Sequence, residues 1–264
     1  MMPVQVFGVL SIDCHGVLLQ GRDLGGAKRR AILELLLLAR GRPVTKDALA
    51  HALWDGHPNP PRDANRTLEQ YVCWLRGRLC ADREQARVII VTGTNSYRLN
   101  LDHFEIDLDR FDRLLLEAEN AAPDRRRELL QQAVDLARGD VLEDAPFAPW
   151  AETDRYIYRD RIARSHVWLS GDLLANGDVR AALRHAEDAL RFAPHCEYAI
   201  RLQMVAYHAL GLSDMARSTF HRCRTELADG LGVDPTSATV DIAAAIDAGA
   251  PVAELIVALT SALV

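Results

Sequence analysis

The sequence lacks the cysteine and histidine spacings that are typical of metal sites. Its five cysteines are odd in number and widely scattered, with no C-x-x-C pair, and its nine histidines include no H-E-x-x-H. Motifs of nucleophilic catalysis and phosphate-binding glycine loops are also missing. We therefore expect reduced thiols, no metal, no cofactor and no enzymatic activity.

Long apolar runs are absent as well. The longest aliphatic stretch, residues 32–38, is interrupted by Glu34 and is far shorter than the ~20 residues of a membrane-spanning helix. The N-terminus has no basic segment followed by an apolar one, so we expect no secretory signal. These absences predict a cytoplasmic protein with no membrane partner.

The charge is distributed unevenly along the 264 residues, a length that is sufficient for two domains. The net charge of −6 divides into +3 for residues 1–105 and −9 for residues 106–264. This asymmetry suits an N-terminal part that binds DNA and a C-terminal part that contacts protein. Two ordinary domains without a nucleic-acid partner explain the charge equally well.

The first hundred residues predict a small sheet, three helices and a hairpin. In order, we expect strands at 4–10 and 17–20, helices at 28–40, 46–54 and from about 61–64 to 79, and a hairpin at 88–101. Thr45 is a good cap for the second helix. The proline-rich segment 55–61 is expected to form a loop.

The third expected helix has one apolar edge and an opposite polar face. Leu68, Val72 and Leu75 lie on the edge, whereas Arg66 and Gln70 lie opposite. Arg and Gln side chains have donors that reach base edges in a major groove about 12 Å wide. Trp74 flanks this face, where a tryptophan needs a partner surface. The alternative is a solvated face that carries a tryptophan by chance.

The expected hairpin has β-prone residues at 88–91, a turn at 92–96 and a returning strand at 97–101. Tyr97 and Leu99 point to one side and Arg98 to the other. An arginine on an exposed hairpin beside a groove-reading helix suits contact with phosphates or the minor groove.

Two motifs in this part resemble a known family. Arg66-Thr67-Leu68-Glu69-x-x-Val72-x-x-Leu75-Arg76-x-x-Leu79 and Tyr97-Arg98-Leu99 resemble the recognition helix and the wing of OmpR-type winged-helix domains. The resemblance implies a third helix in the major groove, a wing on the minor groove and a preceding loop that meets RNA polymerase. The family often has Arg where Cys73 and Trp74 stand and Gly where Ser96 stands, so the target sequence does not carry over.

The C-terminal part predicts helical repeats. The element Gly177-Asp178-x-x-Ala181-Ala182 recurs as Gly211-Leu212-x-x-Met215-Ala216, 34 residues later. This period is typical of tetratricopeptide-like helix pairs, and a degenerate earlier unit is expected at 111–138. A plain helical bundle is the alternative. Asp107 and Asp109 begin this part, and helix capping explains them better than a metal site.

The second half also resembles the bacterial transcriptional activation domain, through 137–142, Trp150-x-x-x-x-Arg155 and the Leu-Gly-Val-Asp-Pro run at 231–235. Together with the first resemblance, the chain is similar to the SARP family of antibiotic regulatory proteins. We expect a mainly α-helical protein with a small β component. Its expected domains are a winged helix at 1–101 and an all-α, tetratricopeptide-like activation domain at 106–264.

The resemblance implies an activator in the cytoplasm, associated with the nucleoid. Its implied partners are direct repeats in double-stranded promoter DNA, RNA polymerase with its sigma factor, and a second protomer on the DNA. The implied targets are secondary-metabolite genes.

The expected site residues fall into two sets. The DNA-binding candidates are Arg66, Thr67, Glu69, Gln70, Cys73, Trp74, Arg76, Arg78, Thr94, Asn95, Arg98, Lys28, Arg29 and Lys46. The candidates for contact with polymerase are Trp54, Asp55, His57 and Asn59.

Three alternatives stay open. In the first, the chain is a helical-repeat adaptor whose winged helix binds protein instead of DNA. In the second, its repeats bind a small molecule as a sensor, which is compatible with DNA binding. Cys73 is either a redox switch or an exposed, inert cysteine.

Overall fold

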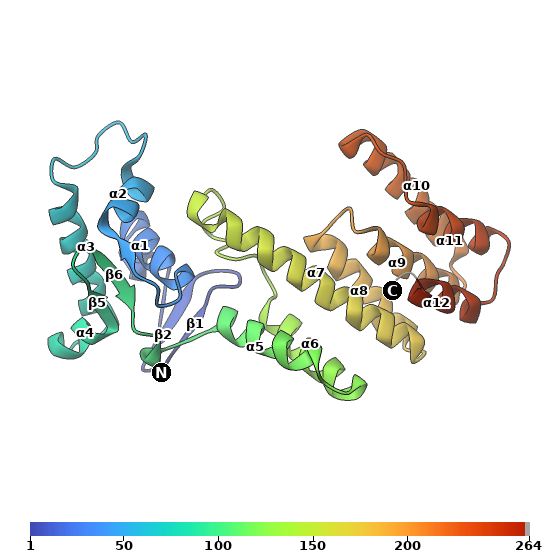
Figure 1. Cartoon of the computed structure of the whole chain (residues 1–264), viewed down its shortest axis with the longest axis horizontal. Helices are drawn as coiled ribbons and strands as arrows, with labels where there is room; N and C mark the ends of the chain where they lie inside the picture. The colour runs from blue at the N-terminus through green and yellow to red at the C-terminus, as the bar shows by residue number, and fades with distance from the viewer. Residues whose placement is uncertain (262–264) are drawn as a thin grey trace. The chain divides into compact units, whose positions relative to one another are not determined.

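The structure is a computed structural model that describes residues 1–261, and it forms two compact units (Figure 1). The first unit contains Met1–Arg113 and Leu136–Ile157, and the second contains Leu114–Asp135 and the chain from Tyr158 onward. The first unit carries all the strands of the described residues, and the second is helical. The predicted fold class is therefore confirmed. The domain bounds 1–101 and 106–264 stay a prediction, because the units alternate along the chain.

The first unit combines two small sheets with a three-helix core. Its elements are β1 (Met2–Gln5), β2 (Ser11–Cys14), β3 (Val17–Gln20), η1 (Gly21–Leu24), α1 (Ala27–Leu38), β4 (Val44–Thr45), α2 (Lys46–Trp54), α3 (Ala64–Leu79), α4 (Arg83–Ile89), β5 (Ile90–Thr92), β6 (Ser96–Leu99), η2 (Leu101–His103), β7 (Phe104–Ile106) and η3 (Pro149–Ala151). The strand orders are β3-β2-β1-β7, in which β7 runs parallel to β1, and β4-β6-β5, which is antiparallel.

Local signals in the sequence place the helices of this unit. The Thr45 hydroxyl accepts a hydrogen bond from the Ala48 amide (3.1 Å) at the start of α2, as predicted. Asp63 caps α3 in the same way, through the Arg66 amide (2.9 Å). The predicted apolar edge of α3 is buried from Leu68 to Leu79, which packs this helix against α1 and α2.

Two predicted strands have other bounds in the structure. The first strand ends at Gln5, since the chain turns at Gly8 with a φ of +85°. Val88 belongs to α4, a helix that we had not predicted from the sequence. Asp82 starts α4 by accepting hydrogen bonds from the amides of the next turn, and the strand of the hairpin begins only at Ile90.

A segment from the second half of the sequence completes the first unit. Residues 136–157 pair with the chain after β1: Leu142 donates to the Val6 carbonyl (2.9 Å) and Gly8 donates to that of Asp140 (2.7 Å). The Arg155 guanidinium is buried and donates to backbone carbonyls of this segment. The N-terminal sheet is therefore continued by residues more than a hundred positions away.

Asp107 starts α5 (Asp107–Glu119) and accepts hydrogen bonds from the backbone amides of Val6 and Phe7 (2.9 Å each). Asp109 forms an ion pair with Arg40 (3.3 Å). Both carboxylates therefore have structural partners, but these are distant amides and an arginine, not the capping contacts that we predicted. Burial raises the pKa of the Asp107 carboxyl to about 6, although the backbone hydrogen bonds oppose this shift.

We expect Asp107 to make the protein less stable as the pH rises from about 4 to 6. The folded protein keeps this proton up to a pH near 6, whereas the unfolded chain loses it near 3.8, so folding binds a proton in this window. The Asp107→Asn variant has no proton to lose there. In urea titrations, the unfolding free energy of wild type should fall relative to the variant by up to about 3 kcal/mol across the window. Parallel pH profiles would contradict the burial of an ionisable Asp107.

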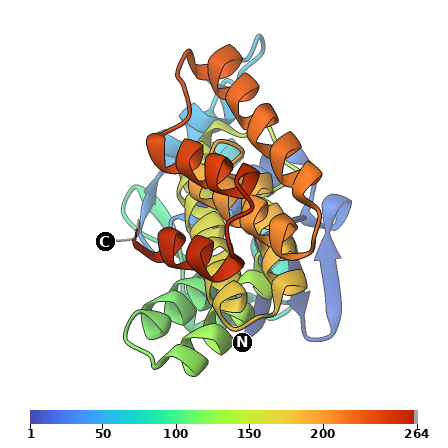
Figure 2. The same ribbon diagram turned by 90° about the vertical axis from the view of Figure 1, so that its right-hand side faces the viewer.

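The second unit is an array of helices around α9. The remaining elements of the chain are α6 (Pro123–Leu136), α7 (Glu152–Ala175), α8 (Val179–Phe192), α9 (Glu197–Ala209), α10 (Ser213–Leu231), α11 (Ser237–Asp247) and α12 (Val252–Ser261). They lie in the second unit apart from Leu136 of α6 and the start of α7 up to Ile157. Helices α8, α10, α11 and α12 all contact α9. Figure 2 shows these successive helices, coloured from orange to red. In the described residues, no helix is long and apolar enough to cross a membrane.

The 34-residue repeat of the sequence corresponds to a repeated turn and a repeated buried position in the structure. Gly177 and Gly211 both have positive φ (+83° and +75°) and form the turns that precede α8 and α10. Five residues after each glycine, Ala182 and Ala216 are fully buried in the core of the unit. Small residues at these places let consecutive helices approach closely, so the tetratricopeptide-like interpretation is supported over a chance resemblance.

Candidate nucleic-acid interface

The exposed side of α3 presents Arg66, Gln70 and Cys73, three or four residues apart. They therefore form one row along the helix, opposite the buried edge. In the described part of the chain, the side chains of Arg66 and Gln70 have no hydrogen-bonding partner. This row is free to hydrogen-bond to another molecule.

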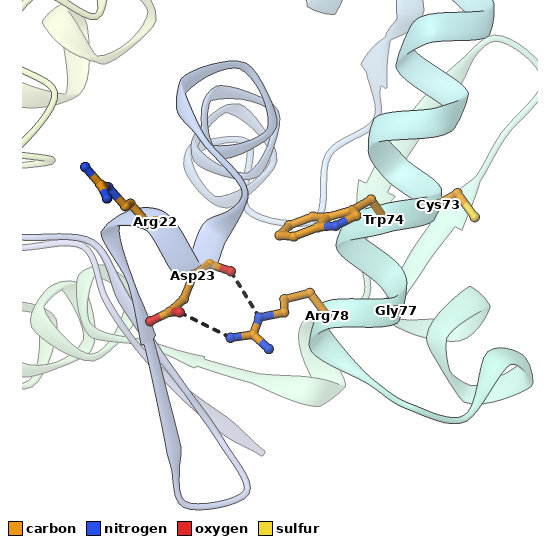
Figure 3. Close-up of a pocket in the computed structure, with 6 residues that line it drawn as sticks. All are labelled: Arg22, Asp23, Cys73, Trp74, Gly77 and Arg78. Carbon is orange, nitrogen blue, oxygen red and sulfur yellow. Dashed lines mark hydrogen bonds and ion pairs between the residues drawn. The ribbon is translucent and has the colours of Figure 1, made fainter.

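Trp74 lies beside this row but has a partner within the protein. Its ring packs against Gly25, and the Arg29 guanidinium stacks over it at 4.7 Å. In Figure 3, Trp74 extends toward the segment of Asp23 while Cys73 points elsewhere. The expectation that Trp74 needs an external partner surface is therefore wrong. Arg29 also stacks on Tyr71 (5.4 Å). Trp74 and Arg29, which we had expected to contact DNA, therefore pack α3 against α1.

Arg78 connects the end of α3 to η1. Its Nε donates to the Asp23 carbonyl (3.1 Å), and its guanidinium forms an ion pair with the Asp23 carboxylate (3.4 Å). Asp23, Trp74 and Arg78 help to line a hollow of about 450 Å³ on the surface of this unit (Figure 3). Asp23 was not singled out by the sequence, since its partner lies 55 positions away.

Arg76 ties α3 to the hairpin. Its guanidinium donates to the Ile90 carbonyl through Nε (3.0 Å) and to the Thr92 hydroxyl (2.7 Å). Burial lowers the pKa of Arg76 below its usual value. These contacts fix the angle between α3 and the strand β5, so the phosphate contact that we expected of Arg76 competes with a structural one.

Other expected contacts also hold elements of the unit together. Lys46 forms an ion pair with Glu69 (2.8 Å), which raises the pKa of Lys46. The Thr67 hydroxyl donates to the Asp63 carbonyl (2.9 Å). The Lys28 ammonium lies over the Trp54 ring at 5.6 Å. The Lys46 pair joins α2 to α3 and the Lys28 contact joins α1 to α2, whereas the Thr67 bond stays within the first turn of α3.

The hairpin has the predicted sidedness. Tyr97 and Leu99 are buried, whereas Arg98 and Thr94 are exposed. Asn95 is also exposed, although its side chain donates weakly to Asp47 (3.3 Å). The tip and outer side of the hairpin therefore offer one cation and two polar side chains.

The four candidates for contact with polymerase, in and before the loop that precedes α3, differ in exposure. Asp55, His57 and Asn59 are exposed. Trp54 is only 7% exposed and packs with its ring 6.4 Å from that of Tyr71, so it belongs to the core and is not available for a surface contact. Arg62, directly before the cap of α3, is also exposed, although we had not predicted a role for it. Its positive charge next to the start of α3 is the feature of the sequence that indicates such a role.

A three-helix unit with a hairpin wing and an exposed polar helix face, in one chain with tetratricopeptide-like repeats, defines a winged-helix transcriptional regulator. Comparison with known families agrees. Residues 106–247 match the bacterial transcriptional activator domain, and residues 24–99 match the C-terminal domain of transcriptional regulatory proteins. The chain belongs to the SARP family of transcriptional regulators, in which an OmpR-type domain precedes this activator domain.

Several relatives are similar over most of this chain. The transcriptional regulatory protein MoaR1 of Mycobacterium tuberculosis is 31% identical over 237 residues, which cover 87% of this chain and 74% of MoaR1. The regulatory protein AfsR of Streptomyces coelicolor is 32% identical over 80% of this chain, but that match covers only 21% of AfsR. A solved structure of Mycobacterium tuberculosis EmbR in complex with a low-affinity phosphopeptide superimposes with a TM-score of 0.79 at 26% identity, over 99% of this chain and 69% of EmbR.

Proposed function

We propose that this transcriptional regulator is an activator that reads promoter DNA with α3 and holds it with the β5–β6 hairpin. The observation that carries the proposal is the unpartnered row of Arg66 and Gln70, which continues to Cys73. Neighbouring polar side chains on the same helix, including Arg76 and Arg78, are engaged within the unit. The side chains that remain free are those that a major groove can accept.

Phosphate contacts complete the proposed interface. Arg62 and Arg98 are exposed cations at the N-terminus of α3 and on the hairpin, and Thr94 adds a hydroxyl at its tip. Phosphate contacts set register and affinity, whereas base contacts set specificity. We assign Arg66 and Gln70 to the bases and Arg62, Arg98 and Thr94 to the backbone or the minor groove.

The partners follow from the family. We propose that two protomers bind direct repeats near the −35 element of a promoter, and that the exposed Asp55, His57 and Asn59 contact RNA polymerase or its sigma factor. The proposed location is the cytoplasm, on the nucleoid. Since the relatives include AfsR and RedD of Streptomyces coelicolor, regulators of the same family, secondary-metabolite genes are the proposed targets.

The proposal is tested first by selection from genomic DNA. The purified protein is mixed with a pool of genomic fragments at two salt concentrations, and the bound fragments are sequenced. We expect enrichment of a direct-repeat motif and an affinity that falls steeply with salt, because neutralising phosphates releases counterions. A folded protein that enriches no motif would favour an adaptor whose winged unit binds protein.

The Gln70→Ala variant should lose discrimination at one or two base pairs, by roughly 1–3 kcal/mol, because a base-edge contact is removed. Affinities for operators with single-base changes measure this loss. Since Gln70 has no partner within the described residues, the thermal stability of the protein should stay unchanged. A uniform loss over all operators, or no loss, would contradict base reading by this side chain.

The Arg98→Ala variant should weaken binding similarly for all operators and lower the salt slope by about 1, as expected when one phosphate contact is lost. Fluorescence anisotropy at several salt concentrations measures both effects. Arg191→Ala is the matched control, since Arg191 is an exposed cation of α8 in the second unit. An equal change of slope in both variants would mean that only net charge matters.

A further inference from the structure

The second unit contains a cavity of about 380 Å³ where residues of α11 and α12 come together over α9. Most of its lining is apolar, with Ile242 and Ala245 from α11 and Leu255 from α12 among the side chains. Its volume lies within the range of small-molecule sites, which are mainly apolar with a few placed polar groups. Here the polar group from α9 is Arg201.

Arg201 is a buried cation with unpaired hydrogen-bond donors. It is 8% exposed, its terminal nitrogen donates to the Thr239 hydroxyl (3.1 Å), and its guanidinium stacks over Tyr198 at 5.1 Å. Within the described residues its Nε is buried without any hydrogen-bonding partner. A guanidinium has five donors, and a buried donor left unpaired is costly.

The nearest acidic side chain on α9 does not supply the missing acceptor. Glu197, one turn earlier, accepts hydrogen bonds at one carboxylate oxygen from the Thr236 amide (2.8 Å) and hydroxyl (2.7 Å) and from the Thr239 hydroxyl (2.6 Å). Burial works against its charge, but these hydrogen bonds and the charge of Arg201 lower the pKa of Glu197. The described residues contain no ion pair within 4.0 Å between Glu197 and Arg201.

We propose that this cavity binds a small, largely apolar molecule through one carbonyl or carboxylate group that accepts hydrogen bonds from Arg201. The acceptor would take hydrogen bonds from terminal guanidinium donors of Arg201 that are not used by Thr239, and the apolar body would lie against Ile242, Ala245 and Leu255. Asp241 and Glu254 also line the cavity. Their negative charges disfavour nucleotides and other polyanions, and they favour a neutral carbonyl over a carboxylate.

Such a ligand would join three helices of the unit. At present α12 and the turn before it are held by the Tyr198 hydroxyl, which donates to the Leu259 carbonyl (3.3 Å), and by His208 Nε2 against the Ala250 carbonyl (3.0 Å). A molecule between α11 and α12 that also contacts Arg201 adds a link to α9. Binding to the folded state alone raises apparent stability. The site is independent of the proposed DNA contacts.

The test uses three probes with the same tail: octanoate, octanamide and octylammonium. Binding to the full chain at pH 7 is measured by titration calorimetry and by saturation-transfer NMR. We expect octanoate and octanamide to bind and octylammonium to bind at least about tenfold more weakly, because it offers no acceptor to Arg201. Bound octanoate should also raise the melting temperature. If no probe binds, or octylammonium binds best, the proposal is wrong.

Three variants locate the site. Ala245→Leu should abolish octanoate binding by filling the cavity, whereas Ala244→Leu, an exposed neighbour outside the lining, should not. Arg201→Met should weaken octanoate at least about tenfold. If Arg201→Met does not fold, the Ala245→Leu and Ala244→Leu pair decides. Unchanged affinity in Ala245→Leu would place any binding elsewhere and overturn the proposal.

Discussion

Replacing Arg155 by methionine should lower the free energy of unfolding by about 3 kcal/mol, because buried carbonyls lose hydrogen bonds to a charged donor, each worth about 1.5–3 kcal/mol. Arg155 is 6% exposed. Its guanidinium donates to five backbone carbonyls, those of Val141, Leu142, Ala145, Pro146 and Ala148. Methionine fills a similar volume but has no donor, so the carbonyls of Val141 and Pro146 lose this donor, and those of Leu142, Ala145 and Ala148 keep only a backbone amide.

The effect should spread into the N-terminal sheet. The segment that Arg155 organises pairs with the chain at Val6 and Gly8, so its loosening frees those amides and carbonyls as well. Hydrogen exchange at these positions should therefore be faster in Arg155→Met than in wild type. Arg155→Lys should lie between the two, because an ammonium keeps the charge but cannot span all five carbonyls.

Arg164→Met is the matched control for Arg155→Met. Arg164 lies on the same helix, α7, and is 76% exposed, so the same substitution there should change stability by no more than about 0.5 kcal/mol. Urea unfolding of both variants measures the difference. Equal losses would mean that the substitution acts through helix α7 in general and not through the buried carbonyls.

Gly25→Ala should destabilise the protein more than Gly232→Ala does. Both glycines end a helix in the left-handed conformation (φ +85°, ψ 24° and φ +68°, ψ 26°), so alanine costs backbone strain of about 1–2 kcal/mol at either place. At Gly25, however, a Cβ atom would overlap ring atoms of Trp74, whereas at Gly232 it meets nothing within 4 Å. Displacing a packed ring adds about 1–3 kcal/mol at Gly25 alone.

The same pair tests how α3 is seated. If Trp74 and Arg29 orient α3 for DNA, Gly25→Ala should also weaken operator binding well beyond any loss in Gly232→Ala. Thermal unfolding and anisotropy titrations measure both quantities. Equal stability losses in the two variants would mean that Trp74 can move without cost, and that its contact with Gly25 does not fix the helix.

Most of the helices and the wing could be predicted because their signals are local. Helix α2 has the predicted bounds, from the cap at Thr45 to Trp54, since the capping residue and the apolar spacing lie within one segment. The alternation of Tyr97, Arg98 and Leu99 likewise determined which side of the hairpin is buried. The glycine turns at 177 and 211 revealed the repeat for the same reason.

The type of each domain, the exposed face of α3 and the family of the protein therefore follow from local patterns in the sequence. Which polar side chains on that face are free depends on tertiary packing. Like Gln70, three other side chains lie off the apolar edge of α3, but their partners lie on other elements: Trp74, Arg76 and Arg78. The pairing of residues 136–157 with the N-terminal sheet and the unpaired donor of Arg201 arise in the same way. Such contacts depend on how distant segments pack against each other. The spacing of residues within one segment cannot predict that packing.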